Sequence, residues 1–128
     1  LMADPGYPCN RNFVRLAGGE PVGVPVGPDT GYQLTAEQAA AAWSDRVRAM
    51  LVASPSNPTG TVYTEEELEA VAQVALEKDL FVICDEVYRE FVFDGGQVRS
   101  FTRFSDLADL LRLGEPFLTQ ILPPSSLR

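Results

Sequence analysis

The sequence predicts an α/β fold in which helices cover both faces of a mostly parallel sheet. Three observations carry this prediction. Residues 50–53 form a short apolar run, residues 80–84 form a second one, and apolar side chains between them recur at helical spacing. A strand, a crossover helix and another strand in this order give two parallel strands joined by a right-handed connection.

The first part of the chain contains shorter elements. Residues 1–3 are predicted to end a strand, and a turn-rich segment follows them. A short helix is expected over residues 10–17, because this segment carries apolar side chains and two glycines follow it. Residues 22–26 alternate valine with other residues, as in a strand. Pro25 places that strand at a sheet edge or cuts it short.

Two helices are marked by their start signals. Thr35 with Gln38, and Thr64 with Glu67, have the spacing of a capping box. The first of these helices is expected to run to Trp43. The second has an acidic first turn, which suits the helix dipole. Its apolar side chains fall on one stripe that consists of Leu68, Val71, Ala72, Ala75 and Leu76.

Composition narrows the classes of function. The 128 residues include no histidine, and Cys9 and Cys84 lack the spacing of metal ligands, so neither a zinc site nor a histidine-based triad is expected. A net charge of -8 without a basic run predicts no nucleic-acid partner. No apolar stretch reaches the roughly 18 residues of a membrane span, so no membrane partner is expected either. Two distant cysteines and no visible signal peptide favour a reducing compartment, and we expect a cytoplasmic protein.

Polar clusters follow the two predicted strands that flank the crossover helix. The loop 54–60 contains Asn57, and the stretch 85–88 begins with Asp85 and ends with Tyr88. In open α/β sheets, ligands bind beyond the carboxyl ends of the strands. The crossover brings both clusters to one edge of the sheet. We therefore expect an amide, a carboxylate and a phenol to converge at one crevice.

Four short motifs occur in a specific order. They are Asp-Pro-Gly-Tyr-Pro at 4–8, Gly-Tyr-Gln-Leu at 31–34, Asn-Pro-Thr-Gly at 57–60, and Asp-Glu-Val-Tyr at 85–88. In this order and spacing they resemble the class I and II aminotransferases, which depend on pyridoxal 5'-phosphate (PLP) and have PLP fold type I. The resemblance covers residues 1–100, which we expect to be part of the PLP-binding large domain. Residues 101–128 are left unassigned; we expect this tail to be truncated or altered, with a short helix predicted at 106–111.

The resemblance implies a cofactor role for four side chains. Asp85 would pair with the protonated pyridine nitrogen of PLP, because the charged ring is the better electron sink. Asn57 and Tyr88 would donate hydrogen bonds to the phenolate oxygen of the ring, and Tyr7 would stack on its face. Each residue also has a structural interpretation: Asp85 as a cap or turn former, Asn57 as a turn residue, Tyr88 as a half-buried core aromatic, and Tyr7 as cover for an edge.

One expected residue is missing. The family forms a Schiff base between PLP and a lysine that lies a few tens of residues after the Asp85 motif. The single lysine of this chain, Lys78, precedes the strand 80–84, and the extended chain between them puts it roughly 20 Å from Asp85. The sequence therefore offers no catalytic residue, and we expect this chain alone not to transaminate.

The implied activity is the transfer of an amino group from an amino acid to a 2-oxo acid. The resemblance also implies a homodimer for the full-length protein. Other fold-type-I enzymes, such as a carbon–sulfur lyase or a cyclopropane-forming synthase, share the same site residue types. A non-catalytic PLP-binding-like domain and a degenerate reading frame are further alternatives.

Overall fold

Five strands lie side by side in the computed structural model, which describes residues 1–93, residues 98–104 and the backbone of residues 111–113. They are β1 (Met2–Asp4), β2 (Gly23–Pro25), β3 (Ala49–Ala53), β4 (Phe81–Asp85) and β5 (Leu111–Leu113). β1 pairs in parallel with β2, and β4 pairs in parallel with both β3 and β5.

Two hydrogen bonds join the two groups of strands. The backbone N–H of Leu51 donates to the carbonyl oxygen of Leu1 at 2.9 Å, and the amino group of Leu1 donates to the carbonyl oxygen of Ala49 at 2.7 Å. This is the pattern of parallel neighbours. The strand order is therefore β2-β1-β3-β4-β5.

The predicted crossover unit is confirmed. β3 and β4 are parallel neighbours, with Ala49 opposite Phe81 and Ala53 opposite Asp85. Helix α3 (Glu65–Glu77) connects them, and it begins with the predicted capping box. The Thr64 hydroxyl accepts from the backbone N–H of Glu67 at 3.2 Å, while the Glu67 carboxylate accepts from the backbone N–H of Thr64 at 2.7 Å.

The other helices are shorter. Helix α2 (Ala36–Ala42) has the predicted capping box at Thr35, and it ends one residue before the expected Trp43. Helix α1 (Pro8–Leu16) begins two residues earlier than predicted, because proline fits the first turn of a helix, where no backbone N–H is needed. Single 3-10 turns are η1 (Pro28–Thr30), η2 (Arg89–Phe91) and η3 (Phe101–Arg103). The helix predicted at 106–111 lies outside the described residues, except that Leu111 begins β5.

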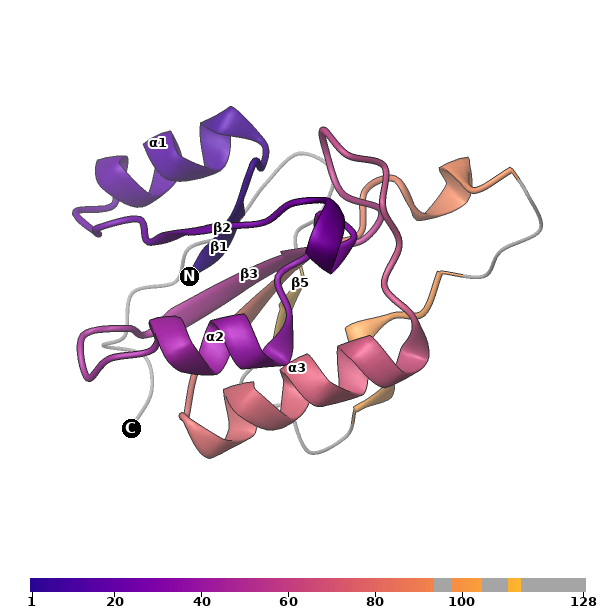
Figure 1. The fold of residues 1–128 in the computed structure, drawn as a ribbon. Coiled ribbons are helices and arrows are strands. Elements are labelled where there is room, and N and C mark those ends of the chain that lie inside the picture. Colours follow the sequence, from indigo (N-terminus) through magenta and orange to yellow (C-terminus); the bar gives the residue numbers. More distant parts are fainter. Residues whose placement is uncertain (94–97, 105–110, 114–128) are drawn as a thin grey trace.

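The hydrophobic core lies between the sheet and one pair of helices. Figure 1 shows α2 and α3 on one side of the strands and α1 on the other. Met50 and Val52 of β3, together with Val82 and Cys84 of β4, are at most 3% exposed and pack in the cluster that includes Leu68 of α3. The alternate strand residues face the side of α1 and are half-buried.

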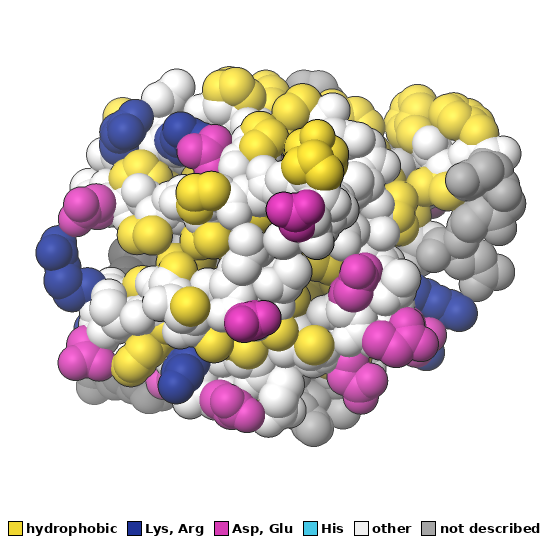
Figure 2. All heavy atoms as spheres, in the orientation of Figure 1, with side chains coloured by type: hydrophobic (Ala, Val, Ile, Leu, Met, Phe, Trp, Pro, Cys, Tyr) yellow, Lys and Arg dark blue, Asp and Glu magenta, His cyan; other side chains and the backbone are white. Residues whose placement is uncertain are grey.

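The described surface carries dispersed charge. Figure 2 shows acidic side chains spread over most of this face, and most of the basic side chains lie toward its rim. None of the described helices is long and apolar enough to cross a membrane.

Candidate functional site

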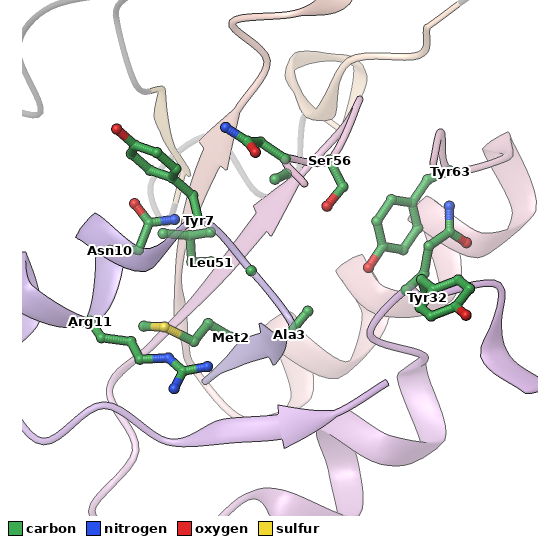
Figure 3. Close-up of a pocket in the computed structure, with 13 residues that line it drawn as sticks. Met2, Ala3, Tyr7, Asn10, Arg11, Tyr32, Leu51, Ser56 and Tyr63 are labelled. Atoms are coloured by element: carbon green, nitrogen blue, oxygen red, sulfur yellow. The ribbon is translucent and has the colours of Figure 1, made fainter. Parts of the chain in front are cut away.

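The candidate site lies where the strand order changes direction. From β1 the chain passes to β2 on one side, whereas from β3 it passes to β4 on the other. The carboxyl ends of β1 and β3 thus border a topological switch point, which is where ligands bind in open α/β sheets. A cavity of about 20 Å³ opens there, which is room for about one water molecule. Its walls come from β1, β3, the start of α1, the segment 32–33 and the loop after β3 (Figure 3).

Asn57 lies in the loop between β3 and α3 and lines this cavity. A tight turn shapes the loop: the backbone N–H of Gly60 donates to the carbonyl oxygen of Ser56 at 2.7 Å. Gly60 has a φ of +71°, a left-handed conformation that glycine adopts without steric cost. The Ser54–Pro55 and Asn57–Pro58 peptide bonds are cis. The amide is thereby carried on a compact turn beyond the end of β3.

Asp85 is the last residue of β4 and lies opposite Ala53. Its carbonyl oxygen accepts from the backbone N–H of Ser54 at 3.0 Å, so the loop with Asn57 starts directly beside it. Its carboxylate is half-buried and accepts from the backbone N–H of Val87 at 3.4 Å. This long contact gives Asp85 the turn-forming role that was predicted as its alternative. A carboxylate can accept several further hydrogen bonds.

Tyr7 is the residue that immediately precedes α1, and it is 42% exposed. In Figure 3, Tyr7 and Asn10 lie across the cavity from Tyr32 and Tyr63. The pKa of the Tyr7 phenol is raised, chiefly by a hydrogen bond with the Cys9 side chain. The nearby Tyr88 and Asp85 raise this pKa by smaller amounts. Three of the four predicted residues are therefore close enough to interact electrostatically.

Tyr88 lies on a second, open depression of about 610 Å³ beside the first cavity. The loop after β3 forms one wall, and residues 88–93 form the other. The Tyr88 ring meets Phe91 edge to face, with 6.1 Å between ring centroids, and Phe91 meets Phe93 in the same way at 6.3 Å. Figure 2 shows hydrophobic side chains gathered on the protrusion at the right of the molecule. In Figure 1 the short turn η2 lies there, drawn in orange-pink.

Asn57 lines both depressions, as does its neighbour Ser56. Asn57 lines the first together with Tyr7 and the second together with Tyr88. Asp85 lines neither, although its charge acts on the Tyr7 phenol. Asn57 and Asp85 thus lie at the same edge of the sheet, as predicted, but the four side chains do not line one crevice: Tyr7 lines the first depression, Tyr88 the second, and Asp85 neither. Their roles toward a cofactor stay predictions.

Tyr63 is a residue of this region that the sequence did not single out. It is 5% exposed, and its hydroxyl donates to the carbonyl oxygen of Leu34 at 3.0 Å. Burial raises the pKa of Tyr63 to about 12. Nothing local marks the residue, because its partner lies 29 positions earlier in the chain.

The single lysine lies away from the site. Lys78 caps the end of α3, and its Nζ stands 4.7 Å from the centroid of the Trp43 ring. Lys78 precedes β4, whereas Asp85 is the last residue of β4, so the length of the strand separates the two side chains. Burial also raises the pKa of the Cys84 thiol, and the nearby Glu86 adds to this, so Cys84 is no ready nucleophile.

Known proteins with similar sequences are aminotransferases. The aspartate aminotransferase of Bacillus sp. (strain YM-2) is 42% identical over 93 residues, which are 73% of this chain and 24% of that protein. The valine–pyruvate aminotransferase of Mycobacterium tuberculosis is 47% identical over 94 residues, again 73% of this chain and 24% of that protein. The chain therefore spans about a quarter of the length of these relatives.

Solved structures agree with the sequence relatives. An N-succinyldiaminopimelate aminotransferase from Mycobacterium tuberculosis matches with a TM-score of 0.80 and 35% identity, over 88% of this chain and 29% of that one. An aminotransferase from the same organism matches with a TM-score of 0.70 and 45% identity, over 77% and 25%.

The family model of class I and II aminotransferases matches residues 1–113. The resemblance inferred from the four motifs is confirmed, and so is the α/β fold. The family is PLP-dependent. This chain belongs to the class I and II aminotransferase family.

Proposed function

We propose that this chain is the part of an aminotransferase that holds the pyridine ring of PLP. The full-length reaction moves an amino group from an amino acid to a 2-oxo acid, within the amino-acid metabolism of the cytoplasm. In this proposal residues 1–100 belong to the PLP-binding large domain, and the complete enzyme is a homodimer. The observation that carries the proposal is that Tyr7 and Asn57 line the cavity at the switch point, with Asp85 of the next strand near enough for its charge to act on Tyr7.

The side chains at this edge fit the chemistry of PLP. The ring of PLP needs an anionic partner for its nitrogen, donors for its phenolate oxygen and a flat surface for its face. Asp85, Asn57 and Tyr88 supply the first two, and the partly exposed ring of Tyr7 supplies the third. The cavity of about 20 Å³ is too small to enclose such a ring, whereas the open depression of about 610 Å³ that Asn57 and Tyr88 line is large enough.

Each side chain has a separate task in this proposal. Asp85 keeps the proton on the ring nitrogen, because a carboxylate beside N–H⁺ favours the charged form. Asn57 and Tyr88 donate hydrogen bonds to the phenolate oxygen and fix the rotation of the ring in its plane. Tyr7 covers one face and excludes water there. When bound, PLP supplies the electron sink for the bonds that break at the substrate carbon.

Binding without catalysis is the second candidate for the chain taken alone. Lys78 is held against Trp43 at the far end of β4, so it cannot serve at the site. We expect the purified 128-residue chain to give no 2-oxo acid from any amino acid when PLP and a 2-oxo acceptor are supplied. Turnover by the unaltered chain above that of free PLP would contradict this expectation, and its loss in Lys78→Ala would show that Lys78 does serve at the site.

The ring-binding proposal is tested with pyridoxamine 5'-phosphate. This form has no aldehyde, so it does not react with Lys78 or with the amino terminus. We expect its fluorescence to report saturable binding, and we expect Asp85→Asn to weaken the affinity by about tenfold or more, as befits a charge-assisted contact. Asp79→Asn is the matched control, because Asp79 is an exposed aspartate at the opposite end of β4. Equal affinities of Asp85→Asn and Asp79→Asn would overturn the proposal.

A further inference from the structure

The loop that carries Asn57 is closed at its base by Ser54. The Ser54 hydroxyl accepts from the backbone N–H of Tyr63 at 3.2 Å, and this bond is buried. The backbone N–H of Ser54 donates to the carbonyl oxygen of Asp85 at 3.0 Å. Ser54 is only 4% exposed. One residue thus ties the start of the loop both to its end and to the strand that carries the site carboxylate.

Tyr63 connects this loop to a third segment. Its ring belongs to the hydrophobic core, and its hydroxyl donates to the carbonyl oxygen of Leu34 at 3.0 Å. Leu34 is 1% exposed, and the two residues before it, Tyr32 and Gln33, line the same cavity as Asn57. Figure 3 shows Tyr63 and Tyr32 next to each other on one side of that cavity.

The hydrogen bond to Leu34 is buried, and an unpaired partner is costly there. Removal of the Tyr63 hydroxyl would leave the Leu34 carbonyl oxygen buried without this donor. A shift of the segment 32–34 away from the loop 54–63 would relieve the unpaired group. Such a movement would displace Asn57 from the position that β3 and the tight turn give it.

We propose that Tyr63, which lines the same cavity as Asn57, is a positioning residue for the PLP ring and acts through Asn57. Its hydroxyl and its backbone N–H hold the segment 32–34, the Asn57 loop and the end of β4 in one arrangement. This inference rests on the proposed function. Side chains that bind a ligand need such second supports to keep their geometry.

A double-mutant cycle separates positioning from general stability. We expect Tyr63→Phe to weaken the binding of pyridoxamine 5'-phosphate by about tenfold, the usual size of one lost hydrogen bond near a site. We expect the same substitution to have no further effect in the Asn57→Ala background, because its action passes through Asn57. Ser54→Ala removes the hydrogen bond between the Ser54 hydroxyl and the backbone N–H of Tyr63. It should also weaken binding in the unaltered chain and have no further effect in the Asn57→Ala background. Val74→Ala, a core substitution on α3, should leave the affinity unchanged.

The outcomes separate the two proposals. Failure of the unaltered chain to bind pyridoxamine 5'-phosphate would remove the proposed function and this inference together. Binding by the unaltered chain, with equal losses from Tyr63→Phe in both backgrounds, would remove the inference alone. If Tyr63→Phe does not fold by circular dichroism, Ser54→Ala decides the question by the same comparison.

Discussion

The two faces of the sheet differ in how completely they are covered. On the face under α2 and α3, Met50 and Val82 are 0% exposed. On the other face, Leu51 and Ile83 are half-buried, and α1 has no buried residue. The free energy of folding therefore comes mainly from the first face, since hydrophobic stabilisation scales with the apolar area removed from water.

The candidate site is built at the junction of these two faces. Tyr63 and Leu34 belong to the well-packed side, whereas Leu51 and Ala53, which also line the cavity, point to the less covered one. Binding sites often combine a rigid support with a surface that stays accessible. The contrast suggests that core packing holds the site in shape while the open face leaves room for a ligand.

The largest expected effect comes from comparing the same leucine-to-alanine substitution on each of the two faces. Leu68→Ala on α3 removes a side chain that is 0% exposed and should lower the free energy of unfolding by about 2–5 kcal/mol. Leu51→Ala on the less covered face should lower it by about 1 kcal/mol, because less apolar area is lost from burial. Urea titrations followed by circular dichroism give both values. Equal losses would mean that the two faces contribute alike and that the comparison is wrong.

A second test uses the buried phenol of the well-packed side. The pKa of Tyr63 is raised to about 12, whereas an unfolded tyrosine titrates near 10. The folded state binds this proton more tightly, so the stabilisation is complete below about pH 10 and is lost as the pH rises toward 12. The loss amounts to up to about 3 kcal/mol.

The control for this pH dependence is Tyr63→Phe. Cys84 also has a raised pKa, but it is present in both proteins, so their difference isolates the Tyr63 phenol. The unaltered chain should lose stability faster than Tyr63→Phe in urea titrations between pH 10 and pH 12. Parallel losses in the two proteins would show that the phenol is not buried as described.

Local signals explain what the sequence could predict of the fold. The start of α3 and both limits of β4 were predicted within a residue, because a capping box and a continuous apolar run are read from neighbouring positions. The approach of Asn57 and Asp85 to the same edge followed from the rule for parallel crossovers. The position of β1 beside β3 depends on hydrogen bonds between Leu1 and the distant Ala49 and Leu51, for which the sequence has no marker.

The candidate site divides in the same way. Asn57, Asp85 and Tyr88 were accessible from their place after strands, whereas Tyr7 was identified only through the family motif. The contact between Tyr63 and Leu34 links positions 29 apart, and such a pair is visible only once the chain is folded. Sequence reasoning thus found the groups that we propose to face the cofactor and missed Tyr63, which we propose to hold Asn57 in place.

The smallest expected effect comes from α1, on the less covered side. Leu16 is 87% exposed, and Leu16→Gln should change the free energy of unfolding by no more than about 0.5 kcal/mol, because little apolar area leaves contact with other residues. The urea midpoint and slope should both match those of the unaltered chain. A loss above about 1 kcal/mol would instead require that Leu16 be packed in solution. In that case the side of α1 would be a second core, and the stability of the chain would not rest mainly on α2 and α3.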